Sequence, residues 1–155
     1  MDRPYHTYIV KIFSRCNLNC TYCYMYNMPD QSYVRQPWGI SEDNIEQFLK
    51  RIREHLDIHN KTTAHIILHG GEPLLGGAAF LRDLFTATDR VLDPQVYSIR
   101  FGMQSNGILF NADVGDALLE RGATIGISLD GPPEVNDRHR VDHAGHGSTA
   151  RVERA

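Results

Sequence analysis

Short apolar runs alternate along this chain with longer segments that carry apolar residues at helical spacing. The apolar runs cover residues 8–13, 65–68, 97–104 and 123–129, and their composition and length predict β-strands. Strands that are separated by helices pair in parallel and form right-handed βαβ units. The alternation therefore predicts an α/β fold with a parallel sheet, in a chain whose 155 residues suffice for one domain.

Three amphipathic segments are predicted to be the connecting helices. Ser41 is placed to cap the first helix, Asn111 is placed to cap the third, and Gly122 is placed to end the third. The apolar positions of the three helices are Ile45, Phe48, Leu49, Ile52 and Leu56; Phe80, Leu81, Leu84, Phe85, Val91 and Leu92; and Val114, Ala117 and Leu118.

All the cysteines of the chain lie in one short segment that follows the first predicted strand. Cys16, Cys20 and Cys23 have the spacing C-x3-C-x2-C. Three thiolates can bind three irons of a cubane cluster, whose iron sites normally take four cysteines. The fourth iron then keeps an open position for chemistry. The alternative is a zinc site, which needs four closed ligands and would have to recruit a distant residue such as His69.

A second unusual segment follows the second predicted strand, where Gly70 and Gly71 precede Glu72 and Pro73. The two glycines and the proline predict a sharp exit from the strand. Glycines also allow a ligand to approach the backbone closely. We expect Glu72 to present a carboxylate at the mouth of a site, where it could hold an ammonium group. An ordinary strand-to-helix turn with a solvated glutamate is the alternative.

The special segments all follow the carboxyl ends of predicted strands. They are the cysteine loop, Gly70 to Pro73, Gln104-Ser-Asn-Gly107 and Ser128-Leu-Asp-Gly131. β/α barrels place their active sites at this end of the strands. The sequence therefore predicts one site that is built from four segments far apart along the chain.

Together these motifs resemble the radical S-adenosylmethionine (radical SAM) superfamily. The cysteine motif with an aromatic residue before its last cysteine, then Gly-Gly-Glu-Pro after the next strand, carries the resemblance, and residues 103–107 and 127–133 look like that superfamily's third and fourth strand ends. Residues 128–132, 136–140 and 145–148 are similar to the peptide- and protein-modifying branch, which includes anaerobic sulfatase maturases and FxsB-like maturases. The resemblance extends from about Tyr8 to the last residue.

The resemblance implies a partial TIM-type (β/α) radical SAM barrel. The superfamily's core has six βα units, and about four are expected here. Residues 1–155 are then the N-terminal portion of a radical SAM core domain, and the remaining barrel and a C-terminal region for auxiliary clusters are absent. The fourth strand is expected to leave an unpaired edge.

The resemblance further implies that Cys16, Cys20 and Cys23 bind a [4Fe-4S] cluster and that SAM chelates its unique iron. An electron from an external donor such as a flavodoxin or ferredoxin would cleave SAM. The resulting 5′-deoxyadenosyl radical would abstract a hydrogen atom from a peptide or protein substrate. The cofactors carry this chemistry, so no catalytic side chain is assigned beyond the cluster site.

By the same resemblance, Tyr22 lies near the adenine of SAM, and the backbone of Tyr24 is a candidate adenine contact. Arg140 could pair with the SAM carboxylate, because a guanidinium suits carboxylates. The remaining implied SAM contacts are Gly70, Gly71 and Glu72 at the methionine amino group, and Ser105, Asn106, Ser128 and Asp130 at the third and fourth strand ends. Ordinary turn or surface roles are equally compatible with the sequence for Ser105, Asn106, Ser128, Asp130 and Arg140.

Composition excludes several classes of partner. A net charge of -3 and a hydrophobic content of 41% predict no nucleic-acid binding. No apolar run approaches the roughly 18 residues of a membrane helix, and residues 1–6 contain no apolar stretch of a signal peptide. Reduced thiols and an oxygen-sensitive cluster fit the cytoplasm. The alternative to an enzyme is a non-catalytic remnant that binds the cluster, with or without SAM, and lacks the substrate half.

Overall fold

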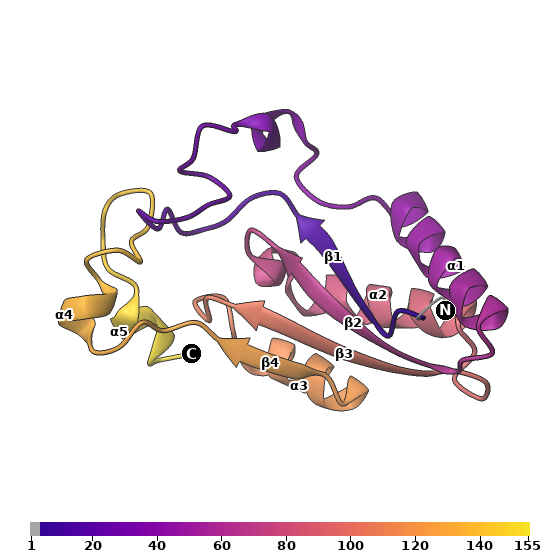
Figure 1. Cartoon of the computed structure of the whole chain (residues 1–155). Helices are drawn as coiled ribbons and strands as arrows, with labels where there is room; N and C mark the ends of the chain where they lie inside the picture. Colours follow the sequence, from indigo (N-terminus) through magenta and orange to yellow (C-terminus); the bar gives the residue numbers. More distant parts are fainter. Residues whose placement is uncertain (1–3) are drawn as a thin grey trace.

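A computed structural model describes residues 4–155, and its centre is a parallel sheet of four strands in the order β1-β2-β3-β4 (Figure 1). The strands are β1 (Thr7–Phe13), β2 (Thr63–Gly70), β3 (Ser98–Ser105) and β4 (Thr124–Ile127). The predicted α/β fold is confirmed. The fourth strand is shorter than predicted, because its hydrogen-bonded register with β3 ends at Ile127. Residues 1–3, part of the segment in which no signal peptide is expected, lie outside the described residues.

Helices α1 (Glu42–Ile58), α2 (Gly77–Val91) and α3 (Ala112–Arg121) connect the strands. The predicted caps are confirmed: the Ser41 hydroxyl accepts the backbone N–H of Asn44 at 3.3 Å, and the Asn111 side chain accepts that of Val114 at 3.0 Å. Gly122 ends α3 with φ 65° and ψ 30°, the left-handed conformation that favours glycine. Four single-turn helices complete the chain: η1 (Ser32–Arg35), η2 (Pro73–Gly76), α4 (Pro133–Asn136) and α5 (Thr149–Val152).

The three long helices cover one face of the sheet (Figure 1), and the core lies between these two layers. Alternate residues of the strands point into this core, among them Ile66, Leu68, Phe101 and Met103. The opposite face is more open, and Ile9 on β1 is 67% exposed. Because β4 pairs only with β3 in the described part of the chain, the predicted unpaired edge is confirmed.

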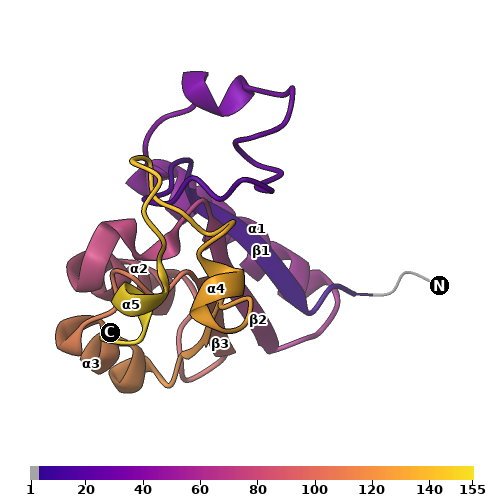
Figure 2. The same cartoon turned by 90° about the vertical axis from the view of Figure 1, so that its left-hand side faces the viewer.

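The segment after β4 folds back onto the cysteine loop, as Figure 2 shows. The backbone N–H of Asn19 donates to the carbonyl of Val141 at 2.7 Å, and that of Thr21 donates to the carbonyl of His139 at 2.9 Å. The loop is therefore held from two sides, by β1 before it and by residues 139–142 across it.

Asp137 anchors this last segment. Its carboxylate accepts the backbone N–H groups of Ser148 and Thr149, each at 2.9 Å, and the side-chain amide of Asn136 at 2.9 Å. These hydrogen bonds lower the pKa of Asp137 to about 2. The ionised carboxylate thus ties α4 to α5. Among residues 4–155, no helix has the length and apolarity needed to cross a bilayer.

The Asp137 anchor predicts an acid-sensitive contribution to stability. A carboxylate with a lowered folded-state pKa stabilises the fold above its unfolded pKa, and this contribution is lost as the pH falls from 3.8 towards about 2. We expect Asp137→Asn to be less stable than wild type at pH 6, with the difference shrinking across this window. Urea unfolding at several pH values measures it. Asp116→Asn, at an exposed carboxylate of α3, is the control, and a pH-independent difference for Asp137→Asn would contradict the prediction.

Candidate functional site

The three cysteines and the strand ends meet around one cavity of about 200 Å³. Every residue predicted for the site lines it except Asp130. The cavity is lined by Cys16, Leu18, Cys20, Tyr22, Cys23, Tyr24, Met25, Tyr26, His69, Gly70, Gly71, Glu72, Gln104, Ser105, Asn106, Ser128 and Arg140. The prediction that four distant segments form one site at the carboxyl ends of the strands agrees with this arrangement.

Cys16 is a half-buried thiol whose sulfur is hydrogen-bonded. Its sulfur accepts the backbone N–H of Leu18 at 3.4 Å and the side-chain amide of Asn106 at 3.7 Å. Burial and, to a smaller extent, the nearby Glu72 carboxylate raise the pKa of Cys16 to about 11. Burial also raises the pKa of Cys20, against the opposing charge of Arg140. Without a metal these thiols are protonated, whereas a coordinating metal ion deprotonates them.

Glu72 is not the solvated residue of an ordinary turn, because it is only 1% exposed. Its Oε1 atom accepts the backbone N–H of Leu74 at 2.9 Å and the hydroxyl of Ser105 at 2.7 Å, and its Oε2 atom accepts the backbone N–H of Asn106 at 2.8 Å. Burial raises its pKa. A carboxylate has about four acceptor positions, so one remains for a bound ammonium group. That role of Glu72 stays a prediction.

The two glycines permit close packing between the end of β2 and the start of the cysteine loop. Gly70 has φ 143°, and a Cβ atom there would lie 2.4 Å from the carbonyl oxygen of Phe13. A Cβ atom on Gly71 would lie 2.0 Å from Tyr26 Oη and 2.1 Å from the carbonyl oxygen of Arg15. Close approach of a ligand was the expected reason for glycine at these two positions. The structure shows a second reason, because any side chain there would collide with the start of the cysteine loop.

Tyr22, Asp130 and Arg140 form a polar cluster on the other side of the cavity. The Tyr22 hydroxyl donates to the Asp130 carboxylate, and the Arg140 guanidinium donates to Tyr22 Oη at 2.9 Å. Arg140 Nη1 also lies 3.7 Å from Asp130 Oδ1, with a side chain that is 12% exposed. Asp130 itself does not line the cavity. It orients Tyr22 and Arg140, which line it.

Ser105 and Asn106 contact other protein groups. The Ser105 hydroxyl is used by Glu72, and the Asn106 side chain donates to Asn17 Oδ1 at 2.7 Å as well as to Cys16. On the opposite face of β3, Gln104 donates to the Ser128 hydroxyl at 2.9 Å. Gln104 was not predicted as a site residue, although the alternation of side chains along β3 turns it away from the core residue Met103.

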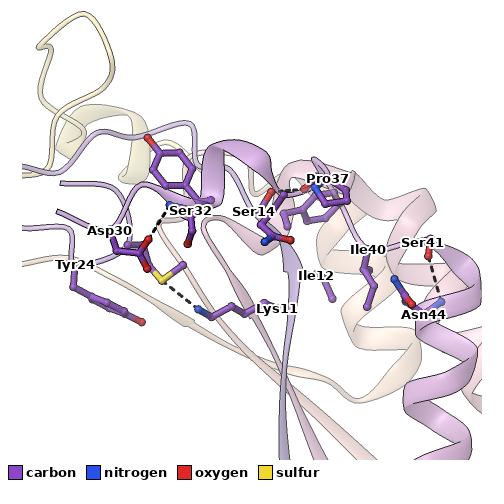
Figure 3. Close-up of a pocket in the computed structure, with 15 residues that line it drawn as sticks. Lys11, Ile12, Ser14, Tyr24, Asp30, Ser32, Pro37, Ile40, Ser41 and Asn44 are labelled. Carbon is purple, nitrogen blue, oxygen red and sulfur yellow. Dashed lines mark hydrogen bonds between the residues drawn. The ribbon is translucent and has the colours of Figure 1, made fainter. Parts of the chain in front are cut away.

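A second cavity, of about 530 Å³, lies beside the first (Figure 3). It opens between β1 and the segment from Asp30 to Asn44, and Tyr24 and Met25 line both cavities. Lys11 extends along its wall and contacts the Met25 sulfur at 3.3 Å. This cavity was not predicted from the sequence, because much of its wall comes from the segment after the cysteine motif, which carries no recognisable pattern.

The arrangement of donors distinguishes the two metal interpretations. Within residues 4–155, no three side chains of His, Cys, Asp or Glu are gathered so that they could hold one metal ion. A zinc ion needs its ligands to converge on one point, whereas the thiolates of a cubane cluster each bind a different iron. The zinc site with His69 therefore has no support in this part of the chain. Three thiols around one cavity fit the cluster.

Comparison with known protein families gives one match that spans nearly the whole chain. The model of the family described as "Radical SAM superfamily" matches residues 10–155.

Curated relatives and solved structures agree with this match. The "Cysteine-type anaerobic sulfatase-maturating enzyme" of Clostridium perfringens (strain 13 / Type A) is 33% identical over 143 residues, which are 92% of this chain and 37% of the relative. The "Serine-type anaerobic sulfatase-maturating enzyme" of Klebsiella aerogenes is 30% identical, over 94% of this chain and 34% of the relative. The solved structure "Native anSMEcpe with bound AdoMet" superposes with a TM-score of 0.79 at 28% identity, over 96% of this chain and 38% of that chain.

The Glu72 contacts predict a specific loss of stability. In Glu72→Gln, an amide N–H₂ group must replace one of the two oxygens that now accept hydrogen bonds, so a donor faces a donor. We expect a loss of about 1–3 kcal/mol in the free energy of unfolding, measured by urea denaturation. The control is Glu120→Gln, whose side chain is 61% exposed in its ion pair with Arg82. Equal stability of Glu72→Gln and wild type would show that the buried carboxylate does not hold the strand ends together.

Proposed function

Because the chain belongs to the radical SAM superfamily, we propose that it forms the cluster- and SAM-binding part of an enzyme that modifies a peptide or protein substrate. The observation that carries this proposal is the cavity in which Cys16, Cys20 and Cys23 meet the ends of β2, β3 and β4. A [4Fe-4S] cluster and SAM bound there would supply reductive cleavage of SAM and a 5′-deoxyadenosyl radical that abstracts hydrogen from the substrate. The residues of the chain bind, orient and shield these groups.

Each of the three cysteines would hold one iron. Cys16 is already fixed by two N–H donors, from Leu18 and Asn106, that stabilise its thiolate form once metal is bound. The loop between Cys20 and Cys23 is a tight turn, in which the N–H of Cys23 donates to the carbonyl of Cys20 at 2.9 Å. The protein thus presents the three sulfurs from a backbone that is held before the metal arrives.

SAM would lie across the ends of β2 to β4. Gly70, Gly71 and Glu72 are proposed to receive its ammonium group, and Arg140 its carboxylate. Arg140 suits this role because it is the cation of the cavity wall and Tyr22 and Asp130 hold its guanidinium in place. Tyr22 and Tyr24 are proposed to lie beside the adenine. Ser105, Asn106, Ser128 and Asp130 are proposed to complete the pocket, with Ser105 acting through Glu72 and Asp130 through Arg140.

The relatives support the proposed substrate class. Solved structures of the similar protein hold a bound Cp18Cys peptide in one case and a bound Kp18Cys peptide in another. The second cavity beside Tyr24 and Met25 offers space next to the SAM site for such a chain (Figure 3). We further propose that an external flavodoxin or ferredoxin supplies the electron and that the protein works in the cytoplasm, where thiols stay reduced.

The chain spans about 37% of the length of the curated relatives. We propose that residues 1–155 are the N-terminal portion of a radical SAM core domain. The remaining barrel strands and the auxiliary-cluster region would then belong to the rest of a larger protein. A cluster-binding piece without its own catalysis is the second candidate, and this share of the relatives' length is what favours it.

Reconstitution with iron and sulfide under anaerobic conditions tests the proposal. We expect roughly four irons per chain and the absorbance of a cubane cluster, and after dithionite and SAM are added we expect 5′-deoxyadenosine by mass spectrometry. The triple variant Cys16→Ala, Cys20→Ala, Cys23→Ala should lose the cluster. The matched control replaces Met28, a sulfur-bearing residue outside both cavities, with Leu.

The outcomes separate the candidates. Cluster together with 5′-deoxyadenosine supports a complete radical-generating site in this chain. Cluster without cleavage supports the second candidate. Cluster absorbance that persists in the triple cysteine variant, or a colourless wild-type protein that holds one zinc ion, contradicts the proposal.

Arg140 makes a separate prediction about SAM. A charge-assisted hydrogen bond contributes about 1.5–3 kcal/mol, so Arg140→Ala should weaken SAM binding roughly 10–100-fold. Changes in the electron paramagnetic resonance (EPR) spectrum of the reduced cluster on titration with SAM measure the affinity. Two variants serve for comparison. Tyr22→Phe removes one hydrogen-bond partner of Arg140 but leaves the charge of Arg140 in place. Arg154→Ala removes an arginine outside the cavity. Unchanged affinity in Arg140→Ala would remove Arg140 from the SAM site.

A further inference from the structure

The hydroxyl group of Tyr26 is buried and has no hydrogen-bond partner among the described residues. A buried hydroxyl without a partner costs about 1–3 kcal/mol, and native structures leave few such groups. Neither the superfamily match nor the assignment of SAM contacts explains why this hydroxyl is buried without a partner. The position of Tyr26 relative to the cysteines offers an explanation.

Tyr26 follows the last cysteine by three residues, and its backbone N–H donates to the carbonyl of Cys23 at 3.3 Å. Its side chain lines the same cavity as Cys16 and Cys23. A phenol has an ordinary pKa of about 10, so near neutral pH the Tyr26 hydroxyl is protonated and can donate a hydrogen bond at the edge of the cysteine loop.

Packing fixes the direction of this donor. The Tyr26 ring meets the ring of Tyr33 edge to face, with centroids 4.7 Å apart. Tyr33 is itself held by Arg15, whose guanidinium donates to its carbonyl at 2.7 Å and lies 5.5 Å from its ring centroid. The Oη atom rests against Gly71, where any Cβ atom would collide with it. The hydroxyl thus stays in place without a protein acceptor.

The structure gives the Tyr26 hydroxyl no acceptor among the described residues. The carbonyl of Arg15 lies beside Gly71, but it accepts the backbone N–H of Glu72 at 2.9 Å and forms no hydrogen bond with Tyr26. The Cys16 sulfur receives two donors, from Leu18 and Asn106, and none from Tyr26. In the cavity that Tyr26 shares with Cys16 and Cys23, a sulfur of a group bound by the cysteines is an acceptor that fits this donor.

We propose that Tyr26 donates a hydrogen bond to a sulfur of the [4Fe-4S] cluster held by Cys16, Cys20 and Cys23, and that this bond raises the reduction potential of the cluster. The inference rests on the proposed function. Reduction adds negative charge to the cluster, and a donor at sulfur stabilises the added charge. In this role Tyr26 tunes the cluster and takes no part in bond making or breaking.

The test compares the reduction potential of wild type and Tyr26→Phe, both as the full chain reconstituted under anaerobic conditions. Phe keeps the ring on Tyr33 and removes only the hydroxyl. We expect the equilibrium constant for one-electron reduction to fall about tenfold, which is 59 mV towards more negative potential. Redox titration followed by EPR measures it, first without SAM and then with SAM. Tyr33→Phe removes a hydroxyl from the packing partner and should leave the potential unchanged.

Tyr26→His, which keeps an N–H donor, is the second variant. If Tyr26→Phe fails to hold the cluster, recovery of the cluster by Tyr26→His supports the proposal and equal failure of both overturns it. An unchanged potential in Tyr26→Phe with an intact cluster overturns it as well. A shift that appears only after SAM is added assigns the hydrogen bond to SAM and overturns the cluster assignment. Absence of a cluster from wild type contradicts the proposed function itself.

Discussion

The buried carboxylate of Glu72 is the interaction on which the geometry of the site depends. Its two oxygens accept donors from the start of η2 and from Ser105 and Asn106 at the end of β3. Asn106 in turn contacts Cys16 in the loop after β1. A single side chain thus links the ends of β2 and β3, and through Asn106 it links both to the cysteine loop. The pairing of β2 with β3 reaches only to Leu68 and Met103, so the Glu72 contacts hold the residues that follow.

Much of the fold could be predicted because its signals are local. The spacing of apolar residues located α1 to α3, and Ser41, Asn111 and Gly122 identified helix ends, since a cap acts within a few residues of itself. The end of β4 was placed too late. Apolar residues continue to Leu129, but pairing with β3 stops at Ile127, and pairing is a tertiary property.

Most residues that line the cavity could be predicted from the sequence, but the contacts among them could not. Motifs at strand ends identify residues that meet, because parallel strands bring their carboxyl ends to one edge. They do not tell whether a side chain faces the cavity or supports a neighbour. Glu72, for example, is buried and accepts three hydrogen bonds. Asp130 supports Tyr22 and Arg140 and does not line the cavity. Tyr26 belongs to none of the motifs, and only its buried hydroxyl without a partner identifies it as a candidate.

The electrostatics of the site explain why metal binding and local order should be coupled. The cavity buries Glu72 next to thiols whose pKa values burial has raised, and three thiolates beside a buried carboxylate would repel one another. Arg140 supplies one compensating cation. Iron bound as proposed would supply the rest, because coordination deprotonates cysteines and places positive charge among the sulfurs. The N–H and O–H donors around the cavity would then stabilise the charge that remains on sulfur, so the hydrogen-bond network and the metal would depend on each other.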